Sequence, residues 1–132
     1  RRSSDLILAK LQKKLARVGC KYRYRAITNT KNTTIHNAML SKIKIKHKKD
    51  VLIYKRGRHR SILEIDLDTV PPLKIFVNHW RSKKGPESGR IHYAKAMMRR
   101  ISKLRKGSEY IVLGDFNSNY NEYKIISKKR DD

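Results

Sequence analysis

The sequence has little cysteine, few acidic residues and no long apolar run. Cys20 is the only cysteine among 132 residues, so an internal disulfide is excluded, and the Cys and His residues show no zinc-binding spacing. A stretch of about 18 apolar residues, which a transmembrane helix needs, is absent. These absences exclude a disulfide scaffold, a zinc finger and a helical membrane span. Cytoplasmic and secreted locations both stay open, and no membrane partner is expected.

The scarcity of acidic residues leaves the chain strongly basic. It contains 34 Lys and Arg residues against 11 Asp and Glu residues, for a formal net charge of +23. Runs of charge can be simply a solvated face, or lysines that protect a sheet edge. An excess of this size favours a polyanionic partner, because binding to phosphates releases counterions. The basic residues cluster at Lys42–Lys49, Lys55–Arg60, Arg81–Lys84, Arg99–Lys106 and Lys128–Arg130.

The periodicity of the apolar residues predicts a mixed α/β protein. Helical spacing predicts one helix over residues 4–18, closed by Gly19, and a second from Ile91 to Leu104. Because the second helix joins the last two predicted strands, these strands are expected to share a sheet. Strands are predicted within residues 21–28, 37–40, 42–47, 61–68, 73–77 and 110–113.

Two polar segments each follow one of the last two predicted strands. The first is Asn78-His79-Trp80-Arg81-Ser82-Lys83-Lys84-Gly85, and the second is Gly114-Asp115-Phe116-Asn117-Ser118-Asn119. Ligand sites of α/β proteins gather beyond the carboxyl ends of strands. The two segments are therefore expected to lie side by side and to form a functional site.

The same segments resemble the endonuclease/exonuclease/phosphatase superfamily, which includes the DNase I-like nucleases. The resemblance rests on Ile111–Ser118 preceded by Val77–Ser82, with weaker support from Asn37–Ile43 and Arg90–Ala96. It implies the α/β (α+β) class and a portion of a four-layer DNase I-like α/β sandwich. A metal-binding Glu and a closing Asp-His segment of the family have no match here. We therefore expect residues 1–132 to form one incomplete domain of a longer enzyme.

The resemblance also implies a role for three residues of the two segments, and the basic residues beside His79 are expected to contact phosphate because of their position. Asp115 matches the aspartate that orients and deprotonates the attacking water, and Asn117 matches the asparagine that holds a phosphate oxygen. His79 matches the histidine that contacts the phosphate. Asp115 and Asn117 are also the expected contributors to a metal site, with Mg²⁺ or Mn²⁺ as cofactor of the complete enzyme. The residues expected to bind substrate phosphate are Asn78, Arg81, Lys83 and Lys84.

The reaction class and the charge together predict a metal-dependent phosphodiester hydrolase, a nuclease acting on DNA or on RNA. One alternative is a phosphatase or sphingomyelinase of the same superfamily, which the charge disfavours. Another is a basic nucleic-acid-binding fragment without catalysis. Simpler interpretations also remain for the residues: Asp115 and Asn117 as an Asx turn, His79 as an ordinary hydrogen-bonded histidine, and the basic loop as a solvated one.

The chain by itself is expected to be inactive and to hold no catalytic metal. Asp115 and Asn117 offer too few oxygens for tight Mg²⁺ binding. Half of a sandwich is also expected to expose an apolar face. A second copy, or a complementing chain, would cover that face.

Overall fold

A computed structural model of the chain describes residues 3–56, 59–119 and 121. The predicted basic cluster Lys128–Arg130 lies outside these residues, as does the middle of the cluster Lys55–Arg60. Neither helix in the described ranges is long and apolar enough to cross a membrane. The elements are α1 (Ser3–Arg17), β1 (Tyr24–Ile27), β2 (Ala38–Ser41), β3 (Ile45–Val51), β4 (Ile62–Leu67), β5 (Leu73–His79), α2 (Glu87–Ser102) and β6 (Glu109–Asp115).

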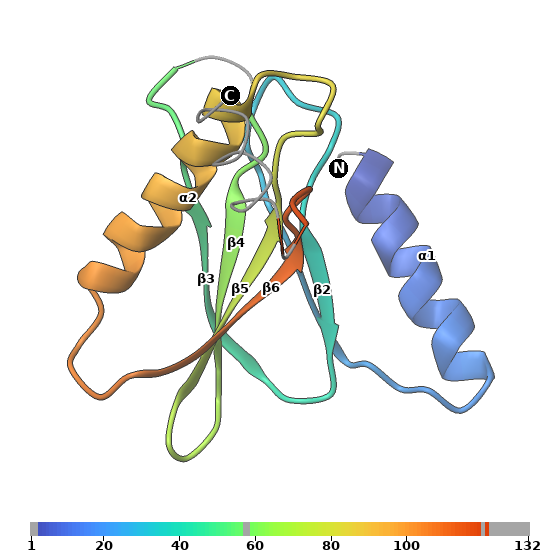
Figure 1. Ribbon diagram of the computed structural model, residues 1–132. Helices are drawn as coiled ribbons and strands as arrows, with labels where there is room; N and C mark the ends of the chain where they lie inside the picture. The colour runs from blue at the N-terminus through green and yellow to red at the C-terminus, as the bar shows by residue number, and fades with distance from the viewer. Residues whose placement is uncertain (1–2, 57–58, 120, 122–132) are drawn as a thin grey trace, which may run out of the picture.

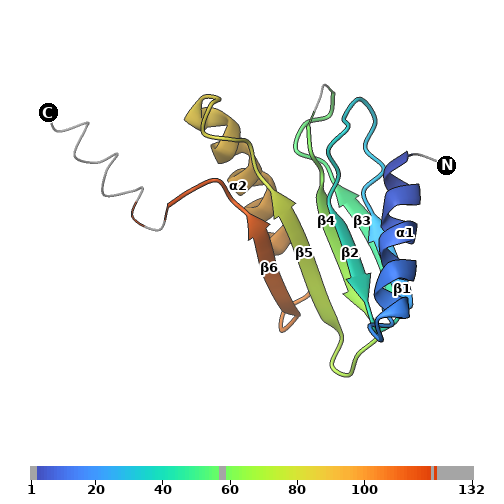
Figure 2. The same ribbon diagram turned by 90° about the vertical axis from the view of Figure 1, so that its right-hand side faces the viewer.

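The elements stack in four layers (Figures 1 and 2). A two-stranded antiparallel sheet of β1 and β2 faces a four-stranded sheet with the strand order β3-β4-β5-β6. Helix α2 covers the outer face of the larger sheet, and α1 lies outside the smaller one. The predicted α/β class and the portion of a layered sandwich are both confirmed.

Within the larger sheet, β3, β4 and β5 pair antiparallel, whereas β5 and β6 pair parallel. β5 and β6 are parallel because of the helix between them. α2 carries the chain back to the end of the sheet at which β5 began, so β6 runs in the same direction as β5. The prediction that the last two strands share a sheet is confirmed. Parallel pairing also brings the carboxyl ends of β5 and β6 to the same edge.

The first helix ends as its sequence predicts. Gly19 has φ of 89°, a left-handed conformation that glycine adopts without steric cost. Its amide donates to the Ala16 carbonyl at 3.1 Å, and the Cys20 amide donates to the Leu15 carbonyl at 2.9 Å. These bonds satisfy carbonyls that the end of a helix leaves without partners.

The structure moves the start of two predicted elements. The predicted strand over 42–47 begins only at Ile45, because Ser41 Oγ donates to the Ile43 carbonyl at 2.8 Å and accepts from the Ile43 amide at 3.0 Å, which forms a turn. The second helix begins at Glu87 rather than at Ile91. There Pro86, with ψ of 148°, is the N-cap residue, and the Glu87 carboxylate lies in the first turn, where the helix dipole favours it.

Two apolar clusters hold the larger sheet between its neighbours. On the α2 side, Ile62 and Phe76 are fully buried against Tyr93, Ala96 and Met97 of the helix. On the opposite face, the alternate residues of β4 and β5 contact the small sheet. The members of this second cluster are Ala26, Leu63, Ile65, Leu67 and Ile75.

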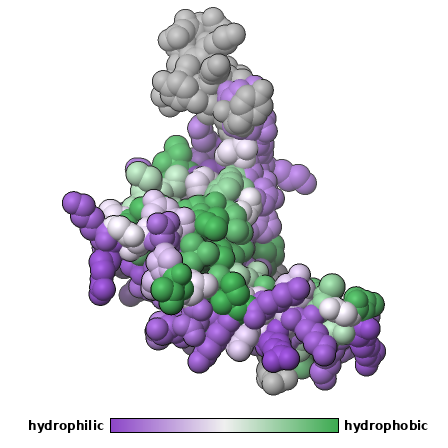
Figure 3. All heavy atoms as spheres, turned by 90° about the horizontal axis from the view of Figure 1, so that it is seen from below, coloured by the Kyte–Doolittle hydropathy of each residue, from purple (hydrophilic) through white to green (hydrophobic). Residues whose placement is uncertain are grey.

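The small sheet leaves part of that second face uncovered. Ile111 and Leu113 of β6 are 46% and 41% exposed, although Val112 between them packs on the α2 side. Figure 3 shows apolar side chains gathered in the middle of the face seen from below, framed by hydrophilic ones. The expectation of an exposed apolar face is therefore met.

A buried carboxylate links three elements of the domain. Glu64 of β4 is 4% exposed, and its carboxylate accepts hydrogen bonds from Lys74 Nζ of β5 at 2.9 Å and from Arg100 Nη2 of α2 at 2.9 Å. Burial raises the pKa of Glu64, but the hydrogen bonds from Arg100 and Lys74 outweigh it, so the pKa lies below its ordinary value. The ion pairs thus keep Glu64 charged inside the domain.

We expect Glu64→Gln to lower the free energy of unfolding by about 3 kcal/mol, because it leaves two cations without their buried counter-ion. Since the folded pKa of Glu64 is lowered, its contribution is present above the ordinary pKa of 4.5 and is lost as the pH falls through the folded pKa. The difference between wild type and variant should therefore shrink in acid. Urea unfolding at several pH values measures this.

Asp66→Asn is the matched control, because the Asp66 side chain is 31% exposed and bonds to the same Lys74. It should cost less than about 1 kcal/mol. An equal loss in both variants, or a difference that stays constant down to low pH, would contradict the role assigned to Glu64.

Candidate active site

The two predicted polar segments meet at one edge of the larger sheet. In the parallel register, Asn78 lies opposite Gly114 and His79 lies opposite Asp115. His79 Nε2 and Asp115 Oδ2 are 3.9 Å apart, and their side chains are 37% and 65% exposed. An imidazole and a carboxylate thus face solvent together at the carboxyl ends of adjacent strands.

The loop after β6 is fastened to the loop after β5 by hydrogen bonds. Trp80 donates its amide to the Asp115 carbonyl at 2.9 Å, and Asn117 Nδ2 donates to the Trp80 carbonyl at 2.8 Å. Asp115 Oδ1 accepts the Asn117 amide at 2.9 Å, and Asn117 has φ of 50°. The Asx turn foreseen as the simpler interpretation is present, and it leaves Asp115 Oδ2 directed toward His79.

Asn78 occupies a different position from the one predicted for it. It is 2% exposed, so it does not reach a substrate phosphate. Its Nδ2 donates to the Leu113 carbonyl at 3.2 Å, and its Oδ1 accepts Trp80 Nε1 at 3.0 Å. We therefore correct its role: Asn78 is buried at the ends of β5 and β6, where its hydrogen bonds hold the loops after these two strands in place.

Gly114 permits the two strands to approach each other at this edge. It has φ of 133°, and a Cβ added there would lie 1.9 Å from the Asn78 carbonyl oxygen. Only glycine combines this backbone conformation with such a contact. The register that sets His79 opposite Asp115 therefore depends on the absence of a side chain at residue 114.

Arg60 is a site residue that sequence reasoning missed. Its Nη1 donates to the Trp80 carbonyl at 3.2 Å, the same oxygen that Asn117 Nδ2 reaches. The hairpin of β4 and β5 supplies the signal that could have found it. Leu63 pairs with Val77, and the same antiparallel register carried outward sets Arg60 opposite Trp80.

The surroundings of His79 favour its neutral form. Burial lowers the pKa of His79, the nearby Arg60 guanidinium lowers it further, and Asp115 raises it by less than the other two effects together. The imidazole is therefore neutral at pH 7, with one nitrogen that donates and one that accepts. A neutral imidazole can hydrogen-bond a phosphoryl oxygen or pass on a proton.

The remaining predicted phosphate-binding residues lie in the loop between β5 and α2. Arg81, Lys83 and Lys84 are all exposed there. The adjacent Trp80 ring packs edge-on against Phe116 with centroids 5.0 Å apart, which anchors the loop. The basic side chains thus follow directly after His79 and are accessible to a large anionic ligand.

The described residues do not fit a divalent-cation site on their own. Among them, no group of three or more His, Cys, Asp or Glu side chains is placed to hold a metal ion. Asp115 Oδ1 already accepts the Asn117 amide, and Asn117 Nδ2 is engaged by Trp80. The predicted metal contributors, Asp115 and Asn117, therefore supply one carboxylate and one amide oxygen, fewer ligands than Mg²⁺ requires.

No family model matches the chain, and no curated protein matches it either. Several solved structures match the chain. TDP2 from D. rerio humanized by 14 mutations superposes with a TM-score of 0.67 at 16% identity, over 89% of this chain and 48% of that one. D. rerio TDP2 complexed with a single strand DNA product gives 0.67 at 16% identity, over 90% and 47%. TDP2 from C. elegans gives 0.61 at 16% identity, over 87% and 36%.

The structural likeness shows the fold. The chain has the layered α/β arrangement of a DNase I-like fold, as the superfamily resemblance implied. It spans about half the length, or less, of the TDP2 structures that it matches.

We expect Gly114→Ala to lower the free energy of unfolding by about 3 kcal/mol or more, because the methyl group meets the Asn78 backbone and the conformation is strained. Gly107→Ala is the matched control: its φ is 81° and nothing lies within 4 Å of an added Cβ. It should cost about 1–2 kcal/mol, from strain alone. Urea unfolding compares them, and equal losses would show that the close approach is unimportant.

We expect Arg60→Gln to raise the pKa of His79, because a nearby positive charge is removed, and Asp115→Asn to lower it, because a negative charge is removed. The pKa of the imidazole can be followed by NMR during a pH titration. Arg99→Gln, an exposed arginine on α2, is the control and should leave the pKa unchanged. A His79 pKa that ignores both Arg60 and Asp115 would contradict the described geometry.

Proposed function

We propose that this chain carries the catalytic edge of a phosphodiester hydrolase that acts on nucleic acid, with DNA as the preferred substrate. The observation that supports this most directly is the pairing of His79 with Asp115 at the ends of adjacent parallel strands. The same fold occurs in a TDP2 structure that contains a single strand DNA product. The net charge of +23 favours a polymeric phosphate substrate over a small phosphate ester or a lipid.

The proposed chemistry follows from what each side chain can do. Asp115 is exposed and carries a carboxylate that can accept a proton from an attacking water. His79, held neutral by burial and by Arg60, can donate a hydrogen bond to a phosphoryl oxygen. Asn117 is held by the Trp80 carbonyl through its Nδ2. We assign it the binding of a phosphate oxygen from the same loop.

The basic loop positions the substrate in this proposal. Arg81, Lys83 and Lys84 are exposed next to the pair, where they can neutralise backbone phosphates without reading base sequence. No step is assigned to a metal ion, because the described residues do not form a site for one. We propose that residues 1–132 are part of a larger domain. The cleavage assay below tests whether the full-length protein requires Mg²⁺ or Mn²⁺.

The test is plasmid cleavage by the full-length protein in Mg²⁺, in Mn²⁺ and in EDTA. Asp115→Asn should lower the rate by about 10²–10⁴-fold, because it removes the group that accepts the proton. It should leave DNA binding intact, because the basic loop remains. His79→Ala should also lower the rate. The matched controls are Asp68→Asn and His47→Ala, which alter exposed residues of the same types away from the site.

Two results would contradict the proposal. Normal turnover in Asp115→Asn would make Asp115 a turn residue only. DNA binding that is insensitive to EDTA and never accompanied by cleavage would favour the alternative of a basic nucleic-acid-binding protein.

A further inference from the structure

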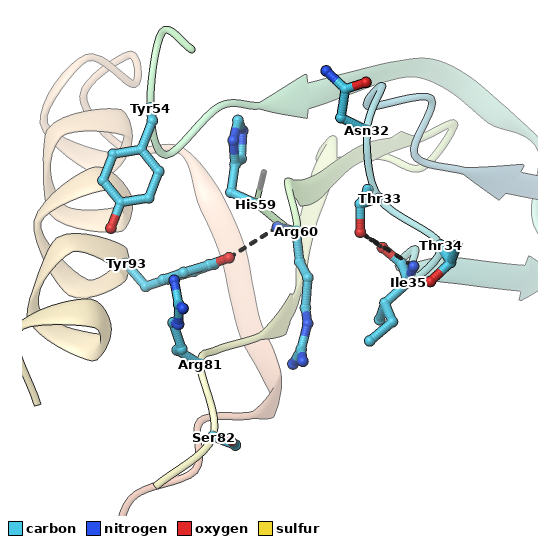
Figure 4. Close-up of a pocket in the computed structure, with 10 residues that line it drawn as sticks. All are labelled: Asn32, Thr33, Thr34, Ile35, Tyr54, His59, Arg60, Arg81, Ser82 and Tyr93. Atoms are coloured by element: carbon cyan, nitrogen blue, oxygen red, sulfur yellow. Dashed lines mark hydrogen bonds between the residues drawn. The ribbon is translucent and has the colours of Figure 1, made fainter. Parts of the chain in front are cut away.

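A pocket opens beside the candidate active site, and the proposed function uses only Arg60 and Arg81 of its lining. Its volume is about 660 Å³, within the range of about 300–1,000 Å³ that small-molecule sites have. Figure 4 shows side chains from three loops and from α2 around it. The lining residues are Asn32, Thr33, Thr34, Ile35, Tyr54, His59, Arg60, Arg81, Ser82 and Tyr93.

The chemistry of this lining suits an anion. None of the ten lining residues is acidic, whereas Arg60 and Arg81 bring two guanidinium groups, and hydroxyl groups supply further donors. Tyr93 stays neutral, because burial raises its pKa despite the Arg60 hydrogen bond and charge. Its hydroxyl oxygen accepts the Arg60 amide at 2.9 Å. Negative charge that would repel an anion is therefore absent from these residues.

Arg60 connects the pocket wall to the loops that carry the His79–Asp115 pair. Arg60 lines the pocket, yet its Nη1 donates to the Trp80 carbonyl, which also accepts Asn117 Nδ2. The Arg60 charge is close enough to His79 to lower the pKa of that imidazole. A ligand group in the pocket would therefore lie next to a group bound at the pair.

Two glycines border the Arg81 side chain in the pocket wall, and Gly89 leaves room for it. A Cβ at Gly89 would lie 3.0 Å from Arg81 Cδ, and a Cβ at Gly85 would lie 3.5 Å from Arg81 Nε. The arginine stem thus lies against bare backbone of α2 and of the loop before it. This support orients an otherwise exposed side chain, and Figure 4 shows Arg81 beside Tyr93 at the pocket.

We propose that this pocket binds the backbone phosphate of the nucleotide that flanks the scissile bond in a nucleic-acid strand, with Arg60 and Arg81 as its ligands. The inference rests on the proposed function for the identity of the strand. The pocket is larger than a phosphate ion needs, so it can also receive the attached sugar. Arginine suits this role because its planar fork of donors matches phosphate oxygens.

The test is the affinity of the full-length protein for a short fluorescent single-stranded oligonucleotide, measured by anisotropy in EDTA so that no hydrolysis occurs. Arg81→Gln should weaken binding roughly tenfold, because a charged hydrogen bond to phosphate is lost. Arg99→Gln, an exposed arginine of α2 outside the pocket, removes the same charge and should weaken binding by less than about threefold. With an uncharged methylphosphonate oligonucleotide of the same sequence, the two variants should bind alike.

Equal losses of affinity in Arg81→Gln and Arg99→Gln would overturn the proposed phosphate site, since the affinity would then depend only on the overall charge of the protein. A selective loss that persists with the methylphosphonate strand would also overturn it, because no phosphate charge is left to recognise. Failure of the proposed function is seen separately, as absence of plasmid cleavage. That result would not change the comparison of oligonucleotide affinities in EDTA, so the proposed phosphate site would be tested independently.

Discussion

The arrangement of the site depends on how closely β5 and β6 pair at their carboxyl ends. The parallel register sets His79 opposite Asp115, and it holds there because Gly114 has no side chain to strike the Asn78 carbonyl. Asn78 then spans from one strand to the other with its buried amide. A side chain at residue 114 would move the two functional groups apart. Backbone approach, rather than attraction between His79 and Asp115, therefore fixes their 3.9 Å separation.

Two of the acidic residues, Glu64 and Asp115, have different electrostatic tasks. Glu64 is buried and pairs with Lys74 and Arg100, so its charge holds β4, β5 and α2 together. Asp115 is left exposed, with one oxygen free of the Asx turn. Burial, together with the Arg60 charge, lowers the pKa of His79 and favours its neutral form. The surrounding positive charge also attracts phosphate.

The proposed active site and the proposed pocket use one set of connections. The Trp80 carbonyl accepts from both Arg60 and Asn117, so the hairpin of β4 and β5 and the loop after β6 meet at a single oxygen. A strand bound across this point would contact the pair with one phosphate and the pocket with the next. The exposed apolar flank of β6, with Ile111 and Leu113, lies on the sheet face opposite α2.

Local sequence patterns determined the elements and the two polar segments. Helical spacing before Gly19, alternation in β4 and the apolar run of β6 identify their elements because each reports a local periodicity. The fold class and the adjacency of His79 and Asp115 followed from the helix that joins β5 and β6. Local patterns could not place Asn78 or Arg60. Asn78 turned inward because the close strands buried it, and Arg60 reached the site only through antiparallel pairing across 20 residues of sequence. Burial and long-range register are properties of the assembled sheet, and tertiary structure alone decided them.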